Sequence, residues 1–166
     1  MPKLIRLAGD AFAWAEDAFT EVADDQDIPA GDVIVSLKRF MAEGDQLLAG
    51  RAVGVRVESD QAVEDLAYDL PRIVVVALSF PKFLDGRAYS SARLLRERYG
   101  YKGQIRAVGE VLREQALLMV RCGFDAFAPT DGSDPETWAA AAHRYRHVYQ
   151  RAADHRIPAY VERSEG

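Results

Sequence analysis

The sequence feature that most constrains the fold is Ile73-Val-Val-Val-Ala-Leu78, an unbroken apolar run in the middle of the chain. A strand that is apolar at every position is typical of the centre of a sheet covered by helices on both faces. The run is the longest apolar stretch in the chain, yet it is far shorter than the ~20 residues of a membrane span. The sequence therefore predicts a buried central strand and no membrane-spanning helix.

Shorter β-branched or apolar runs flank this strand, and segments of helical periodicity separate them. The five expected strands are 33–37, 53–57, 73–78, 104–108 and 124–128. The expected helices are 40–49, 61–70, 88–99, 111–122 and 134 to about 153. This alternation predicts parallel β-α-β units, so we expect an α/β domain over 31–166 with a mainly parallel sheet of about five strands flanked by helices. A complete eight-fold barrel needs about 250 residues, so the alternative is a half-barrel of β/α units that dimerises.

Residues 1–30 carry the weakest structural signal. Three aspartates, Asp24, Asp25 and Asp27, precede Pro29 there. We expect an irregular or partly helical N-terminal arm.

Composition excludes several classes of protein. The 166 residues carry 21 basic and 26 acidic side chains, a net charge of −5, whereas a general nucleic-acid binder would show a basic excess. The single cysteine, Cys122, rules out an internal disulfide and a Cys-ligated iron–sulfur cluster held by this chain alone. It is expected to be a buried small hydrophobe. Acidic residues interrupt any signal-peptide core near the N-terminus, so we expect a cytoplasmic protein.

Ionisable residues gather where the expected strands end. In open parallel sheets, ligands bind beyond the carboxyl ends of the strands. Asp85 follows the third strand and Glu110 follows the fourth, so these two are the candidates for a catalytic acid or base. The candidate supporting residues are Ser79, Gly86, Gly109 and Gln115.

Basic residues are concentrated in the middle of the chain. Residues 82–121 hold nine Lys or Arg and four acids, 9 − 4 = +5, within a chain of net charge −5. Such a segment suggests a site for an anion or an acidic partner surface. The candidate anion ligands are Arg87, Arg106, Arg93 and Arg113. The alternative for Arg87 is a salt bridge with Asp85 that caps a turn, and for Arg106, which lies in an apolar strand, a structural pair with Glu110 or Asp85.

Common cofactor and catalytic motifs are absent. The sequence contains no Gly-x-Gly-x-x-Gly after a strand, no Walker-type phosphate loop and no Gly-x-Ser-x-Gly elbow. His143 and His147 are four residues apart, but Arg144 and Arg146 lie between them and would repel a cation. The sequence therefore assigns no cofactor and predicts no metal site.

Four stretches of the chain carry a resemblance to a known family. They are Phe80-Pro-Lys-Phe-Leu-Asp-Gly-Arg87, Tyr89-Ser-Ser-Ala-Arg-Leu-Leu-Arg96, Gly103-Gln-Ile-Arg-Ala-Val-Gly109 and Arg121-Cys-Gly-Phe-Asp-Ala-Phe127. The segment 50–128 resembles the bacterial domain-of-unknown-function family 934, with Glu114 where the family often has Asp. Members are often labelled as oxidoreductases of sulfite reduction because their genes lie beside those of assimilatory sulfite reductase. The resemblance implies a role in sulfate assimilation.

Three functions are weighed from these observations. The first is an accessory protein or oxidoreductase component of assimilatory sulfite reduction, because one cysteine and no haem signature leave the chain without ligands for the reductase's siroheme and iron–sulfur centre. It would bind sulfite reductase or a small anion through the arginine-rich segment. The second is an enzyme acting on a phosphorylated or nucleotide-like substrate at the strand ends. The third is a structural homodimer subunit, with the Gln115 stripe and the Trp138 helix as its interface.

Overall fold

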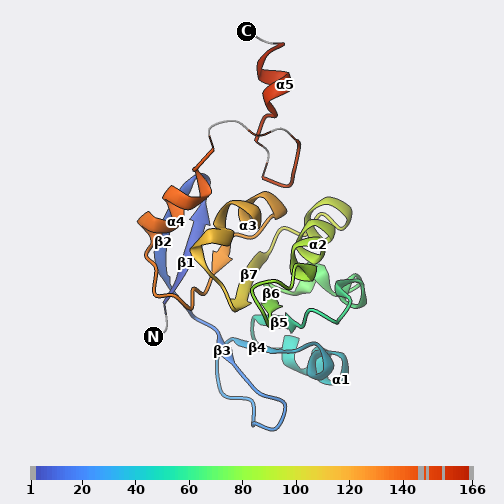
Figure 1. The fold of residues 1–166 in the computed structure, drawn as a ribbon. Coiled ribbons are helices and arrows are strands. Elements are labelled where there is room, and N and C mark those ends of the chain that lie inside the picture. The colour runs from blue at the N-terminus through green and yellow to red at the C-terminus, as the bar shows by residue number, and fades with distance from the viewer. Residues whose placement is uncertain (1–2, 146–147, 149, 155, 165–166) are drawn as a thin grey trace.

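The chain forms one sheet of parallel and antiparallel strands, and helices pack along its outer face (Figure 1). A computed structural model describes residues 3–145, 148, 150–154 and 156–164. The strands are β1 (Lys3–Ala8), β2 (Ala11–Glu16), β3 (Thr20–Glu21), β4 (Val33–Ser36), β5 (Val53–Val57), β6 (Val75–Phe80), β7 (Gln104–Gly109) and β8 (Ala126–Phe127). The α-helices are α1 (Leu37–Leu48), α2 (Arg87–Arg93), α3 (Ala116–Cys122), α4 (Pro135–Ala142) and α5 (Ala159–Glu162).

The eight strands are ordered β2-β1-β8-β7-β6-β5-β4-β3. From β3 to β8, neighbouring strands are parallel, whereas β1 is antiparallel to both β2 and β8. Each strand from β4 to β8 is added on the same side of the previous one, so right-handed crossovers place the connecting helices on one face. The sheet curls around its other face into a half-barrel, the alternative that the sequence left open.

The two edges of the sheet lie close together because β2 and β3 are joined by only three residues. A flat eight-stranded sheet would span seven strand intervals, roughly 34 Å. The chain from Glu16 to Thr20 covers four residue steps and at most about 14 Å. The connector Asp17-Ala18-Phe19 therefore crosses the open side of the half-barrel, and we call residues 17–22 the strap.

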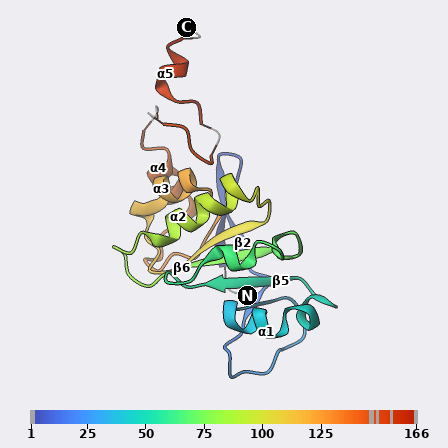
Figure 2. The same cartoon turned by 90° about the vertical axis from the view of Figure 1, so that its right-hand side faces the viewer.

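Alternation along the strands separates an outer from an inner face. Val55, Val76 and Ile105 point outward into the core formed with α1 to α4, and Figure 2 shows these helices around the curled sheet. On the inner face, Val75 and Ala77 are fully buried in a second, smaller cluster that includes Phe19 of the strap. The prediction that helices cover the central strand on both faces is therefore wrong, because a strap residue covers its inner face.

All five predicted parallel strands are present, as β4 to β8, with shifted ends. Residues 3–21, in contrast, form three strands instead of an irregular or partly helical arm. The signal was the dipeptide Gly9-Asp10 between two runs of six residues, since a Gly at positive φ is typical of a two-residue hairpin turn; Gly9 has φ 62°. Tertiary pairing with β8 and β4 then holds these short strands in place.

Four of the predicted helices are shorter or different. Residues 61–70 contain a 3₁₀ turn at Val63–Leu66, and a second 3₁₀ turn, Leu70–Arg72, follows. After α2 the helix continues as a π-helix, Leu94–Arg98, and before α3 there is a 3₁₀ turn, Arg113–Gln115. The helix expected from 134 to about 153 is α4, which ends at Ala142, and the chain then returns to α3.

This return places a charged pair beside α3. There the Ala153 N–H donates to the Arg121 carbonyl over 3.1 Å, and Arg121 pairs with Asp154 at 2.5 Å. His147 and His155 lie outside the described residues. Within the described part of the chain, no helix is both long and apolar enough to cross a membrane.

Candidate functional site

The predicted site at the carboxyl ends of the strands is built around the loop between β6 and α2, residues 81–86, which we call the β6–α2 loop. Glu110, the first residue after β7, accepts a hydrogen bond from the Phe83 N–H at 2.6 Å. Its own N–H donates to the Phe80 carbonyl at 2.7 Å. Glu110 therefore holds the beginning and the middle of the loop, and its carboxylate is engaged with the backbone.

Gly109 allows the chain to come close enough to Phe80 for Glu110 to make these contacts. Its φ is +90°, and a Cβ added there would lie 2.4 Å from the Phe80 carbonyl oxygen. Only glycine fits this backbone conformation and this close approach. The predicted supporting residue Gly109 is thus required by geometry at the end of β7.

Asp85 and Arg87 lie together at the start of α2. Two Arg87 nitrogens donate to the Asp85 carboxylate at 3.0 and 2.7 Å, and the Arg87 N–H donates at 3.2 Å. Arg87 also donates to the Ser59 hydroxyl at 3.0 Å. The Arg87 guanidinium first, and then the Ser59 hydroxyl, hold the pKa of Asp85 well below its usual range. Asp85 is therefore a poor proton donor or acceptor near neutral pH. The predicted supporting residue Gly86 directly precedes α2.

Arg106 lies away from this loop. It is buried on the inner face of β7 and forms a two-pronged pair with Asp17 of the strap at 2.6 and 3.0 Å. It also donates to Gln104 at 2.8 Å, and its guanidinium lies 5.9 Å from the Phe19 ring centre. The expected structural pair exists, but its acid is Asp17 instead of Glu110 or Asp85. An arginine at this position in a strand points to the inner face, away from the strand ends.

Arg56 on β5 occupies the equivalent place two strands away. It pairs with Glu21 of the strap at 2.5 Å and with Glu58 at 2.7 Å, and donates to the buried Ser79 hydroxyl at 3.3 Å. Burial opposes its charge, but the two carboxylates raise the pKa of Arg56. The predicted supporting residue Ser79 thus faces the inner side of the sheet and not the β6–α2 loop. The signal for Arg56 was the same as for Arg106, a charge within an apolar strand.

The arginines of the inner face stand in one row across the sheet. Strand register places Arg56, Ala77, Arg106, Ala126 and Arg6 side by side. Alanine beside each arginine leaves room for the long side chain to lie along the sheet. The strap supplies the carboxylates for two of the three arginines. This row is therefore a structural element that ties the strap to the parallel sheet.

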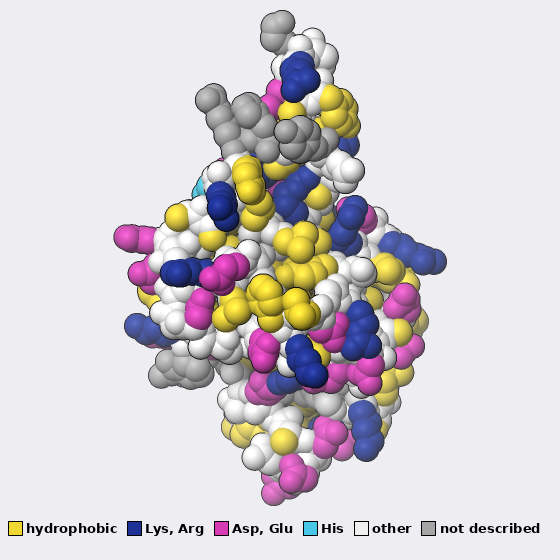
Figure 3. Space-filling model, viewed as in Figure 1, with side chains coloured by type: hydrophobic (Ala, Val, Ile, Leu, Met, Phe, Trp, Pro, Cys, Tyr) yellow, Lys and Arg dark blue, Asp and Glu magenta, His cyan; other side chains and the backbone are white. Residues whose placement is uncertain are grey.

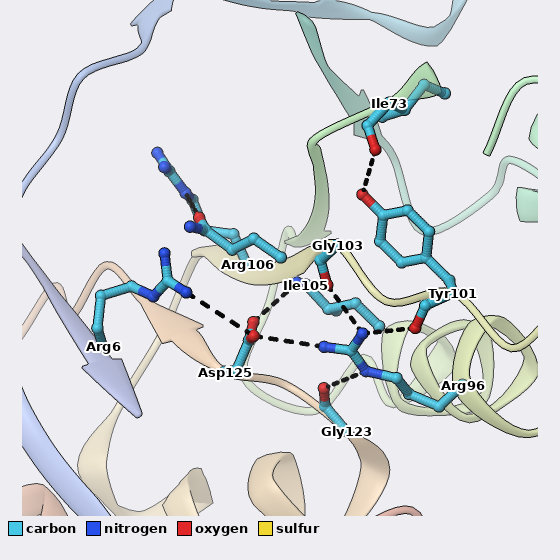
Figure 4. A network of polar contacts seen from close by, with 10 residues as sticks. Arg6, Ile73, Arg96, Tyr101, Gly103, Ile105, Arg106, Gly123 and Asp125 are labelled. Atoms are coloured by element: carbon cyan, nitrogen blue, oxygen red, sulfur yellow. Dashed lines mark hydrogen bonds and ion pairs between the residues drawn. The ribbon is translucent and has the colours of Figure 1, made fainter. Parts of the chain in front are cut away.

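Arg96 forms a further polar network at the opposite, amino-terminal ends of the strands (Figure 4). Its guanidinium donates to the carbonyls of Gly123, Tyr101 and Gly103 at 3.0, 2.7 and 2.8 Å and lies 3.5 Å from Asp125. Burial lowers the pKa of Arg96 and raises that of Asp125. In the structure, Arg96 holds together the loops that precede β7 and β8.

The remaining predicted residues are dispersed. Arg93 pairs with Glu97 on the surface of its helix. The Arg113 N–H donates to Asp131 at 3.3 Å, and its side chain lies 3.7 Å from Glu114. Gln115 is buried, and its Oε1 accepts a hydrogen bond from the Leu112 N–H at 2.9 Å. Cys122 is buried, as expected, and burial raises the pKa of its thiol to about 11.

A cavity of about 650 Å³ lies near the amino-terminal ends of the strands. Its lining includes Phe12, Arg96, Asp125 and His143 but none of the predicted site residues. In the part of the chain that the structure describes, no three His, Cys, Asp or Glu side chains are placed to share a metal ion.

The β6–α2 loop has an exposed apolar tip. Leu84 is 90% exposed and Phe83 is 42% exposed, and Figure 2 shows the loop projecting from the body. Hydrophobic side chains gather at the centre of the face that carries α2 and α3, with charged side chains around them (Figure 3). The predicted catalytic residues therefore shape a projecting loop, a geometry suited to contact with another surface.

Comparison with known proteins identifies the family. No curated protein matches the chain. The model of a family described as "Bacterial protein of unknown function (DUF934)" matches residues 54–160. The match covers more than half of the 166 residues and contains the whole β6–α2 loop, while β1, β2 and the strap precede it. The chain therefore belongs to the bacterial family of unknown function DUF934.

Proposed function

We propose that this protein is an accessory component of assimilatory sulfite reduction that docks on a partner protein through the β6–α2 loop. Sulfite reductase is the partner that the family resemblance suggests. The observation that carries the docking proposal is that Glu110, Asp85 and Arg87 are engaged in holding the loop, while Phe83 and Leu84 at its tip are exposed. A preorganised apolar anchor loses little conformational freedom when it binds.

The charge around the loop favours an acidic partner surface. Three of the nine basic residues in 82–121 are largely buried in structural pairs, namely Arg96, Arg106 and Arg121. The six exposed ones are Lys82, Arg87, Arg93, Arg98, Lys102 and Arg113. Of these six, Lys82 lies in the loop and Arg87 directly follows it, and basic groups beside an apolar tip steer an acidic surface toward it and set the orientation of the complex.

A small-anion site and an enzyme receive less support from the same geometry. Arg106 is buried and neutralised by Asp17, so it is not available to an anion at the strand ends. Asp85 is held in its ionised form by Arg87, and the Glu110 carboxylate accepts the Phe83 N–H. Neither carboxylate is placed to exchange a proton with a substrate without first releasing the loop.

The experiment is a retention assay with the tagged chain from cells grown on sulfate, followed by mass spectrometry and by binding to purified sulfite reductase. We expect the reductase to be retained and Leu84→Glu to weaken binding at least tenfold, about 1.4 kcal/mol. Truncation or reversal of a central interface anchor commonly has an effect of that size. Arg87→Ala should also weaken binding, and more strongly at low salt.

The matched control is Met41→Glu on α1, which introduces the same charge at another exposed apolar residue. It should leave binding unchanged. Equal binding by wild type, Leu84→Glu and Arg87→Ala would reject the β6–α2 loop as the docking surface. Failure of sulfite reductase to bind at all would reject the proposed partner.

A further inference from the structure

The free edge of β2 can accept another strand. β2 ends the sheet on one side, and the two-residue turn before it makes Ala8 and Ala11 a hydrogen-bonded pair. Such pairs alternate along an antiparallel ladder. The N–H and C=O groups of Phe12, Trp14 and Glu16 therefore point away from β1.

The hydrogen bonds of the residues that follow β2 support this assignment of which backbone groups point away from β1. Residues of the same parity, Thr20 and Val22, donate their N–H groups to the carbonyls of Asp32 and Ile34 at 2.9 Å each. Because side chains and backbone groups alternate with period two, even-numbered residues of this extended segment bond on the side away from β1. Beyond Glu16 that side is filled by β4, whereas along β2 no strand among the described residues pairs there.

The two edges of the sheet differ in how they are protected. β3 has only two residues, and Asp24, Asp25 and Asp27 follow it, so short length and charge discourage pairing there. β2 is six residues long and reads Ala-Phe-Ala-Trp-Ala-Glu, with no charge before Glu16 and no proline. A six-residue edge without a protective lysine or proline is a template for strand pairing.

We propose that β2 pairs with β2 of a second copy of this chain, antiparallel, about a two-fold axis at Trp14. The pairing joins two half-barrels through a continuous sheet. A two-fold axis makes the contact isologous and closes it as a dimer. Trp14, 47% exposed in the single chain, becomes covered by its counterpart.

Charge selects this register over the neighbouring one. Only registers that place even residues opposite even residues join the free backbone groups. With Trp14 opposite Trp14, Glu16 lies opposite Phe12, and all three free residues are paired. A shift of two residues in one direction would place Asp10 opposite Glu16, and a parallel arrangement would place Glu16 beside Glu16; like charges directly opposite destabilise a sheet. A shift in the other direction would place Phe12 opposite Ala18, which lies outside β2, so fewer of the free groups would be paired.

The surfaces named in the sequence analysis cannot serve this purpose. Trp138 is fully buried against Phe127, with ring centres 4.6 Å apart, and Gln115 is buried as well. Both already belong to the core of the single chain. The edge of β2 is on a different part of the molecule from the β6–α2 loop, so dimerisation and partner docking can be tested separately.

Light scattering of the full chain after size exclusion measures the association. Near 50 µM we expect a mass close to twice 18.4 kDa, falling toward 18.4 kDa on dilution. Trp14→Lys, which places a charge on the edge, should weaken association at least tenfold while the circular dichroism spectrum stays native. Thr20→Lys adds the same charge at the β3 edge and should leave the dimer intact.

Cross-linking tests the register. In a Cys122→Ser background, Trp14→Cys should give a covalent dimer with a short bismaleimide, and Thr20→Cys should not. A wild-type mass of 18.4 kDa at every concentration overturns the proposal, even if the chain then accepts a strand from another protein. A dimer that Trp14→Lys leaves unchanged, or that cross-links equally at both edges, also overturns it.

Discussion

Replacing Asp17 with Asn tests the strap most directly, because the change removes the charge that neutralises Arg106. The two side chains are 15% and 6% exposed, and their two contacts are 2.6 and 3.0 Å. Breaking a buried ion pair by removing one partner costs about 3–5 kcal/mol, since the other charge stays buried. Arg106 keeps its bond to Gln104, and Asn can still accept the Phe19 N–H. We therefore expect the lower end, a loss of about 3 kcal/mol in the free energy of unfolding.

Urea unfolding followed by circular dichroism measures this loss, and heating should show a Tm lowered by about 6–12 °C for a chain of this length. Glu16→Gln, one residue away but exposed, is the matched control and should stay within about 0.5 kcal/mol of wild type. In a double-mutant cycle, Arg106→Met should remove most of the penalty of Asp17→Asn, because no buried charge then remains. An unfolding free energy of Asp17→Asn within about 0.5 kcal/mol of wild type would refute the strap as a stabilising element.

Three further predictions concern the loop, the core and the polar network. Gly109→Ala should lower the free energy of unfolding by about 2 kcal/mol or more, because φ is positive there and a carbonyl oxygen lies 2.4 Å from the new Cβ. The control Gly132→Ala, at φ 70° in open space, should lower it by about 1 kcal/mol. Chemical denaturation measures both variants. Because burial raises the pKa of Cys122 to about 11, its thiol stays protonated at pH 8; a thiol reagent should label it only after unfolding, and rapid labelling of the native chain would contradict its burial. Tyr101→Phe removes the hydroxyl that donates to a backbone carbonyl at 3.0 Å and leaves that buried carbonyl unpaired, so thermal unfolding should report a loss of about 1–3 kcal/mol.

The parallel strands were predictable because their apolar runs and the helical segments between them are local features. The five expected strands all occur, and the half-barrel was one of the two arrangements that the alternation allows. The order of the strands decides between them, and strand order depends on long-range pairing that periodicity does not encode. The N-terminal strands were missed because each is short and finds its partner only in the folded sheet, as β1 does in β8.

The candidate site, like the fold, was predictable from local sequence features only in part. The position after a strand correctly brought Asp85, Arg87 and Glu110 to one edge of the sheet. In the structure the Asp85 and Glu110 carboxylates accept hydrogen bonds from the backbone N–H groups of Arg87 and Phe83, contacts that their positions after the strands did not indicate. Arg106 was recognised as a charge that must be paired, but its partner Asp17 lies 89 residues away in sequence, and no local pattern links the two.

The sequence by itself determined the elements: apolar runs of strand length, helices between them, a glycine at the end of β7, and an excess of positive charge in residues 82–121. These follow from local sterics and from the need to bury apolar side chains. Only the tertiary structure decided which arginines are buried, which carboxylates neutralise them, and which sheet edge is left open. Those outcomes depend on the curl of the sheet, which brings residues 17–22 across its inner face and places charges beside partners that are distant along the chain.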